Sequence, residues 1–186
     1  KVEVKPANCL PAARPATPSF NHPHMPSLPS TFPELMDQLV RDRGERVFLP
    51  RRTAQDHTPI SFGRVVDDVD ALASALLDLG LHRGDRVGIV AENRYEWLAI
   101  DLALASIGVV DVPRGSDTTP TELKFILQHS GSCAAFAEND KVAVDLLTMR
   151  AELPALRHVI VMADATAIDG ALALGDLLKS GAKKRD

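Results

Sequence analysis

The sequence has little of the chemistry that marks disulfide-rich, metal-binding or membrane-spanning proteins. It contains only 2 cysteines among its 186 residues, and Cys9 and Cys133 lie far apart in unlike contexts. Neither a disulfide framework nor a cysteine metal site is predicted, and we expect a cytoplasmic location, where thiols stay reduced. Asp101 and Asp111 interrupt the most hydrophobic stretch, which therefore falls short of the roughly 18 apolar residues of a transmembrane segment. We expect no such segment.

Motifs that carry catalysis are also absent. The sequence has no Gly-x-x-x-x-Gly-Lys-Ser/Thr loop, no Gly-x-Gly-x-x-Gly after a strand, and no His-Glu-x-x-His or Cys-x-x-Cys. No nucleophile lies at an informative spacing from a general base. We therefore predict no catalytic residue and no metal site within this chain.

The charge balance excludes further partners. A net charge of -4 provides no general attraction to nucleic acid or to an anionic membrane, and we expect neither as a partner. The 45% hydrophobic and 25% charged residues are those of an ordinary globular protein, and the length suits one domain.

Proline is concentrated at the N-terminus. The first 33 residues hold Pro6, Pro11, Pro15, Pro18, Pro23, Pro26, Pro29 and Pro33. Because proline removes backbone donors and fixes φ, residues 1–30 are predicted to be extended or disordered. Residues 31–186 are predicted to form the folded domain.

The folded part is organised around a strand, a helix and a second strand. Arg86–Ala91 and Val109–Val112 are short β-branched runs of strand length, and between them Asn93 is the expected N-cap of a helix that Gly108 ends. Two strands joined by one helix indicate a parallel βαβ unit. Since ligand loops of such units lie at the carboxyl ends of the strands, we expect them at Glu92-Asn93 and Arg114–Thr119.

The same alternation continues to the end of the chain. Further helices are predicted from a Thr31 cap to Gly44, over Phe62–Leu79, from a Thr119 cap to Ser130, over Val142–Leu153 and over Leu172–Lys179; further strands over Cys133–Ala137 and His158–Met162; and a hairpin over Val47–Arg52 and Thr58–Phe62. We predict an α/β fold, a mainly parallel sheet with helices on both faces plus the small hairpin.

Two sets of side chains allow a structural and a functional interpretation. Asp67, Asp68 and Asp70 lie on or near the polar face of a predicted helix, where we expect solvated surface in preference to an acid–base site. Trp97, the only tryptophan, falls on an apolar helix face and is expected to pack in the core, although it could line a ligand pocket.

One loop is a candidate ligand site. Arg114, Gly115 and Ser116 follow a parallel strand and precede a helix N-terminus, so a guanidinium, backbone N–H groups and hydroxyls could converge on a phosphate. The alternative is that Ser116, Asp117 and Thr118 serve only the turn and the helix cap.

A series of short segments resembles the N-terminal portion of the adenylate-forming enzymes, the superfamily of acyl-CoA synthetases, luciferases and adenylation domains. The matching pieces, in the same order and at similar spacing, are Ile60-Ser61-Phe62, Leu76–Gly80, Gly84-Asp85-Arg86-Val87, Asn93 with Glu96-Trp97, Ile107-Gly108-Val109-Val110, Val112-Pro113, Thr121-Glu122-Leu123 and Ile126-Leu127. The run Glu96-Trp97-Leu98 with Asp101 is most similar to long-chain fatty acyl-CoA synthetases.

The resemblance implies a chemistry that this chain carries only in part. Such enzymes use ATP and Mg²⁺ to convert a fatty acid to an acyl-adenylate and then to a coenzyme A thioester. The phosphate loop and later signature motifs of the family have no match here, so we expect a fragment that is inactive alone. Its expected partner is the remainder of the polypeptide or a second copy of itself.

The resemblance also bears on the candidate loop and leaves alternatives open. In some relatives the loop that corresponds to Arg114, Gly115 and Ser116 contacts the nucleotide end of coenzyme A, which makes these residues the candidate cofactor contacts. Another adenylate-forming activity, or a non-catalytic α/β binding module, remains an alternative. A reading frame that continues past Asp186 into the phosphate loop would favour the enzyme.

Overall fold

A computed structural model of the protein describes residues 29–50 and 59–184. The prediction that residues 1–30 lack regular structure therefore lies almost entirely outside the described residues. Pro29 and Ser30, which are described, belong to no helix or strand.

The core of the fold is one five-stranded sheet, in the order β4-β3-β5-β6-β7, and every neighbouring pair is parallel. The strands are β3 Arg86–Val90, β4 Val110–Arg114, β5 Ala134–Ala137, β6 His158–Val161 and β7 Ala171–Ala173. The predicted parallel sheet is confirmed. The short strand β7 falls at the start of the segment that the sequence predicts as a single amphipathic piece.

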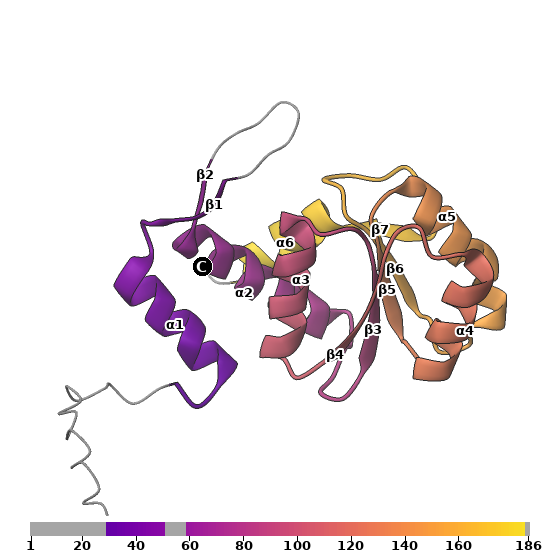
Figure 1. Cartoon of the computed structure of the whole chain (residues 1–186), viewed down its shortest axis with the longest axis horizontal. Helices are drawn as coiled ribbons and strands as arrows, with labels where there is room; N and C mark the ends of the chain where they lie inside the picture. The colour runs from indigo at the N-terminus through magenta and orange to yellow at the C-terminus, as the bar shows by residue number, and fades with distance from the viewer. Residues whose placement is uncertain (1–28, 51–58, 185–186) are drawn as a thin grey trace, which may run out of the picture.

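Helices cover both faces of this sheet (Figure 1). On one face lie α2 Phe62–Asp78, α3 Tyr95–Ser106 and α6 Leu174–Ala182, and on the other α4 Pro120–Ser130 and α5 Asp140–Met149, which runs into the 3₁₀ turn η1 Arg150–Glu152. Each face has its own cluster of buried apolar side chains, separated by the sheet. The predicted two-sided α/β arrangement is confirmed.

Helix α1 (Phe32–Arg43) and the antiparallel pair β1 (Val47–Pro50) and β2 (Pro59–Ser61) lie beside α2, outside the parallel sheet (Figure 1). The predicted Thr31–Glu34 capping box is present at the start of α1. The rings of Phe48 and Phe62, 4.7 Å apart, link the hairpin to the start of α2. The antiparallel strand pair of the predicted hairpin is thus confirmed, while its residues 51–58 lie outside the described residues.

The predicted ends of α1, α2 and α4 are confirmed, whereas three other helices differ from the prediction. Helix α5 begins at Asp140, after an Asn139 cap, and not at Val142, and α6 spans Leu174–Ala182 and not Leu172–Lys179. Thr119 caps α4 by accepting a hydrogen bond from the Glu122 N–H at 3.3 Å, and Gly131 ends that helix with φ 64°. Asn93 is not the cap of α3, as the sequence predicts: the backbone remains extended through Arg94, and α3 begins at Tyr95. Arg94 is the cap residue; its side chain makes no capping hydrogen bond and pairs with the first-turn acid Glu96, at 2.7 Å.

The expectation of solvated acids on α2 is wrong for Asp68. Its side chain is buried, receives the Arg64 Nε–H at 2.9 Å, and accepts the Tyr95 hydroxyl hydrogen at 2.6 Å. Burial and the hydrogen bond to Asp68 raise the pKa of Tyr95 above its ordinary value. Helix α3 packs across this turn of α2, which a helical wheel of α2 alone does not reveal. Asp67 and Asp70 are exposed as predicted.

Helices α2 and α6 approach each other closely on their shared face of the sheet. A Cβ at Gly181 would overlap the backbone carbonyl of Ala71, so only glycine permits this contact. Within the described residues, no helix is long and apolar enough to cross a membrane.

The amino edge of the sheet contains a half-buried histidine among cations. His158 is the first residue of β6. Burial lowers the pKa of its ring, as do the nearby charges of Arg157 and Arg150, and a hydrogen bond to the Leu79 backbone offsets only part of this effect. The folded protein therefore favours the neutral ring. As pH falls below the ordinary histidine range, the unfolded chain takes up the proton first, so stability declines until the folded protein is protonated as well.

We therefore expect the urea midpoint to fall between pH 7.5 and pH 5, and to fall less in His158→Gln. The exposed His129→Gln variant serves as the control and should retain the decline of the wild type. Equal declines in all three proteins would contradict the assignment to His158.

Candidate functional site

The two predicted ligand loops lie side by side at the carboxyl edge of the sheet. Val90, the last residue of β3, pairs in parallel register with Arg114, the last residue of β4. The following loops therefore start next to each other. They border a cavity of about 240 Å³ that is open to solvent and lined by Ala91, Glu92, Asn93, Trp97, Pro113, Arg114 and Gly115.

Arg114 lies on the exposed side of this cavity. Strand β4 is an edge strand among those described, and its Val110 N–H and Arg114 carbonyl face β3. Pro113, between these positions in the alternation, faces outward, where no N–H is required. The Arg114 guanidinium donates to the Pro113 carbonyl at 2.6 Å. Arg114 forms no ion pair with any described residue, so its charge is available to an anion.

The Ser116 and Thr118 donors of the loop after β4 are already used within the protein. Ser116 directs both its N–H and its hydroxyl at Glu92 Oε1, at 3.3 and 3.2 Å. The Thr118 hydroxyl and N–H both donate to the Gly115 carbonyl, at 2.8 and 3.2 Å. The loop therefore has features of both interpretations. Its hydrogen bonds are those of a turn, and the Arg114 guanidinium lies beside a cavity that a ligand could occupy.

Trp97 combines the two roles that the sequence leaves open. Its indole is half-buried and packs against the core cluster on the α3 face, and it also lines the cavity. Asn93, free of a capping role, is exposed in the same lining. The Glu92 carboxylate is the member of the site that sequence reasoning did not assign a contact. Glu92 lies two residues after the end of β3, and Ser116 lies two residues after the end of β4. The contact between them could be predicted only if the register of the two strands were known.

The parallel strands β3 and β5 flank the point where the strand order reverses: the chain passes from β3 to β4 on one side and from β5 to β6 on the other. Ligands of open α/β sheets commonly bind at such a point. Here an ion pair spans that point: Arg94 Nη1 lies 4.0 Å from Glu138 Oε1, at the end of β5, and Arg94 Nε lies 2.7 Å from Glu96. The cavity therefore lies on the other side of β3, between the loops after β3 and β4.

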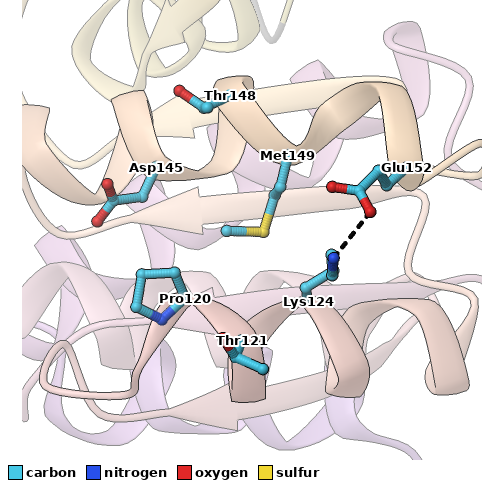
Figure 2. Close-up of a pocket in the computed structure, with 7 residues that line it drawn as sticks. All are labelled: Pro120, Thr121, Lys124, Asp145, Thr148, Met149 and Glu152. Atoms are coloured by element: carbon cyan, nitrogen blue, oxygen red, sulfur yellow. Dashed lines mark hydrogen bonds and ion pairs between the residues drawn. The ribbon is translucent and has the colours of Figure 1, made fainter.

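A second hollow, of about 220 Å³, separates α4 from α5 (Figure 2). Lys124 crosses it to Glu152 at 2.8 Å, Asp145 and Thr148 lie along its α5 side, and the largely buried Met149 reaches in from α5. The charges within this groove are paired, since Asp145 also binds Lys141. The groove lacks the unpaired cation that distinguishes the carboxyl-edge cavity.

The described residues do not fit a metal ion. No group of three or more His, Cys, Asp or Glu side chains in the described ranges could hold one. The carboxyl edge instead offers one exposed guanidinium, that of Arg114, beside an open cavity.

The chain belongs to the AMP-binding enzyme family, whose model matches residues 36–183. It is 32% identical, over 76% of its length, to the long-chain-fatty-acid–CoA ligase FadD15 of Mycobacterium tuberculosis. It is 29% identical, over 78% of its length, to the peroxisomal long chain acyl-CoA synthetase 7 of Arabidopsis thaliana. The chain spans only 23% and 21% of the length of these two relatives.

Solved structures show the same fold. The A-PCP didomain of the carboxylic acid reductase of Segniliparus rugosus, in complex with AMP, superposes with a TM-score of 0.72 at 14% identity, covering 84% of this chain and 27% of that one. At this identity the likeness concerns the fold alone. It confirms the adenylate-forming architecture that the sequence predicts for this segment.

Substitutions at Trp97 and Asn93 separate packing from capping. Trp97→Ala should lower the free energy of unfolding by about 2 kcal/mol, less than the loss for a fully buried tryptophan, because the indole is half-buried. Asn93→Ala should change it by less than about 0.5 kcal/mol, since Asn93 does not cap α3. Urea denaturation measures both. A loss of about 1 kcal/mol in Asn93→Ala would restore the capping role.

Proposed function

We propose that this chain is the N-terminal segment of an ATP-dependent fatty acid–CoA ligase. Such an enzyme activates the acid to an acyl-adenylate and then forms the thioester with coenzyme A. The observation that carries the proposal is the family match over residues 36–183, and the mycobacterial ligase supports the choice of fatty acids. No observation favours another adenylate-forming activity or a non-catalytic module.

The chain by itself is proposed to be inactive. Binding a triphosphate requires a nest of backbone N–H groups together with a lysine or a metal ion. At the loop after β4, the Ser116 and Thr118 donors serve the protein itself, and no lysine lines the cavity. ATP and Mg²⁺ would therefore be held by parts of the enzyme outside this chain.

The role proposed for this chain's own residues is to bind one end of coenzyme A. Arg114, Gly115 and Ser116 are the proposed contacts. The support is the exposed guanidinium without an ion-pair partner, beside a cavity with an indole in its lining. A guanidinium pairs well with phosphate oxygens. These residues would position the nucleotide end of the molecule and take no part in bond making.

The remaining proposals concern location and partners. A cytoplasmic location is supported by the free, buried thiol of Cys133. A partner, either the rest of the same polypeptide or a second copy, is supported by exposed apolar side chains on α4 and α5, with Phe125 65% and Val144 49% exposed. Cell fractionation and sedimentation velocity are the corresponding measurements.

ATP–pyrophosphate exchange with a panel of short, medium and long fatty acids tests the activity. The isolated chain should give no exchange, because the residues that bind triphosphate are not in it. A fusion in which this chain replaces the matching segment of the mycobacterial ligase should give exchange and thioester formation. Exchange by the isolated chain would refute the incomplete-site proposal, and a folded fusion without activity would count against the ligase assignment.

Coenzyme A titration of the chain tests the proposed contact. Arg114→Ala should weaken binding by about fivefold to tenfold, because an exposed charge-assisted hydrogen bond is lost. Arg83→Ala removes another exposed charge, near Gly108 and away from the residues that line the cavity, and should leave the affinity unchanged. Equal affinities in wild type and Arg114→Ala would remove Arg114 from the site.

A further inference from the structure

The carboxyl-edge loops bring a carboxylate to the point where an anion would need donors. Glu92 and Ser116 each lie two residues beyond the paired ends Val90 and Arg114, so the parallel register sets them opposite each other. The Glu92 Oε1 atom then receives the Ser116 N–H at 3.3 Å and the Ser116 hydroxyl at 3.2 Å. Both donors of Ser116 are therefore engaged by one acidic oxygen.

Gly115 allows this close approach. A Cβ at that position would lie 3.3 Å from Glu92 Oε1 and 2.7 Å from Asp117 Oδ1. The backbone of the loop is thus flanked by two carboxylates. The only cation that lines the cavity, Arg114, donates to the Pro113 carbonyl and forms no ion pair with either acid in the described structure.

We infer that Glu92 determines which anionic ligands this loop accepts. The inference rests on the proposed ligand contact at Arg114 and Ser116. The Glu92 carboxylate occupies the Ser116 N–H and hydroxyl, the donors that a phosphate oxygen would need. Its negative charge also repels the negative charge of a bound anion. A simple anion such as inorganic phosphate must displace Glu92 before it reaches Ser116. A ligand that brings its phosphate to Arg114 and also offers a hydrogen-bond donor to Glu92 does not meet this penalty.

Glu92 is accordingly a specificity-determining residue, and nucleotide-like ligands are the class it favours over inorganic phosphate. A base or a sugar hydroxyl provides the donor, while the phosphate provides the charge for Arg114. The indole of Trp97, in the same cavity lining, adds an aromatic surface for such a ligand.

The test is a pair of titrations, one with inorganic phosphate and one with coenzyme A, followed by the Ser116 amide resonance in ¹⁵N-labelled chain. Glu92→Gln removes the charge but keeps an oxygen that can accept from Ser116, so the turn is retained. We expect Glu92→Gln to bind phosphate at least about fivefold more tightly than wild type, with a smaller change for coenzyme A.

Asp117→Asn is the matched control, because it removes one charge from the same loop without touching the Ser116 donors. It should tighten phosphate binding less than Glu92→Gln does. The inference is overturned if Glu92→Gln and Asp117→Asn behave alike, if both ligands change by the same factor, or if phosphate affects the Ser116 amide in no variant.

The proposed contact and this inference fail in different ways. If coenzyme A affinity does not depend on Arg114, the proposed contact is lost. If coenzyme A affinity does depend on Arg114 but Glu92→Gln changes the affinity for neither phosphate nor coenzyme A, the proposed contact stands and the role of Glu92 is refuted. Thermal denaturation of each variant confirms that the comparison concerns folded protein.

Discussion

Strand β3 is hydrogen-bonded on both sides, to β4 and to β5, and the placement of the candidate site depends on that double pairing. A strand covered on both faces has room only for apolar or small side chains. At Gly88 a Cβ would lie 2.7 Å from Leu127 Cδ2, so the glycine lets α4 pack directly on the sheet. With α4 fixed there, the loop that joins it to β4 must pass beside the loop after β3.

The orientation of α3 depends on two polar contacts at its start. Tyr95 reaches Asp68 on α2, and Arg94 reaches Glu138 at the end of β5. The Asp68 carboxylate is buried and satisfied by Arg64 and Tyr95 together, so losing either partner would leave a poorly solvated charge. These contacts hold the first turn of α3, and Trp97 within that turn consequently faces both the core and the cavity.

The candidate site defined by these elements lies at the carboxyl edge of the sheet, between the loops after β3 and β4. It joins one guanidinium, an indole and a carboxylate that competes for the donors of the loop. Under the proposed function, these groups would bind and orient one end of coenzyme A.

The sequence alone determined the α/β class, the order of the elements and most helix ends, because hydrophobic periodicity, capping residues such as Thr119 and stops such as Gly131 act locally. It also placed Arg114 at a strand's carboxyl end. Only the tertiary structure decided that Asp68 is buried, that Arg94 replaces Asn93 as the cap residue, and that Glu92 meets Ser116. The burial of Asp68 and the contact between Glu92 and Ser116 depend on helix packing and strand register between segments distant in sequence, and local patterns carry no information about such contacts. The cap of α3 is a local difference of one residue, which the capping pattern alone did not resolve.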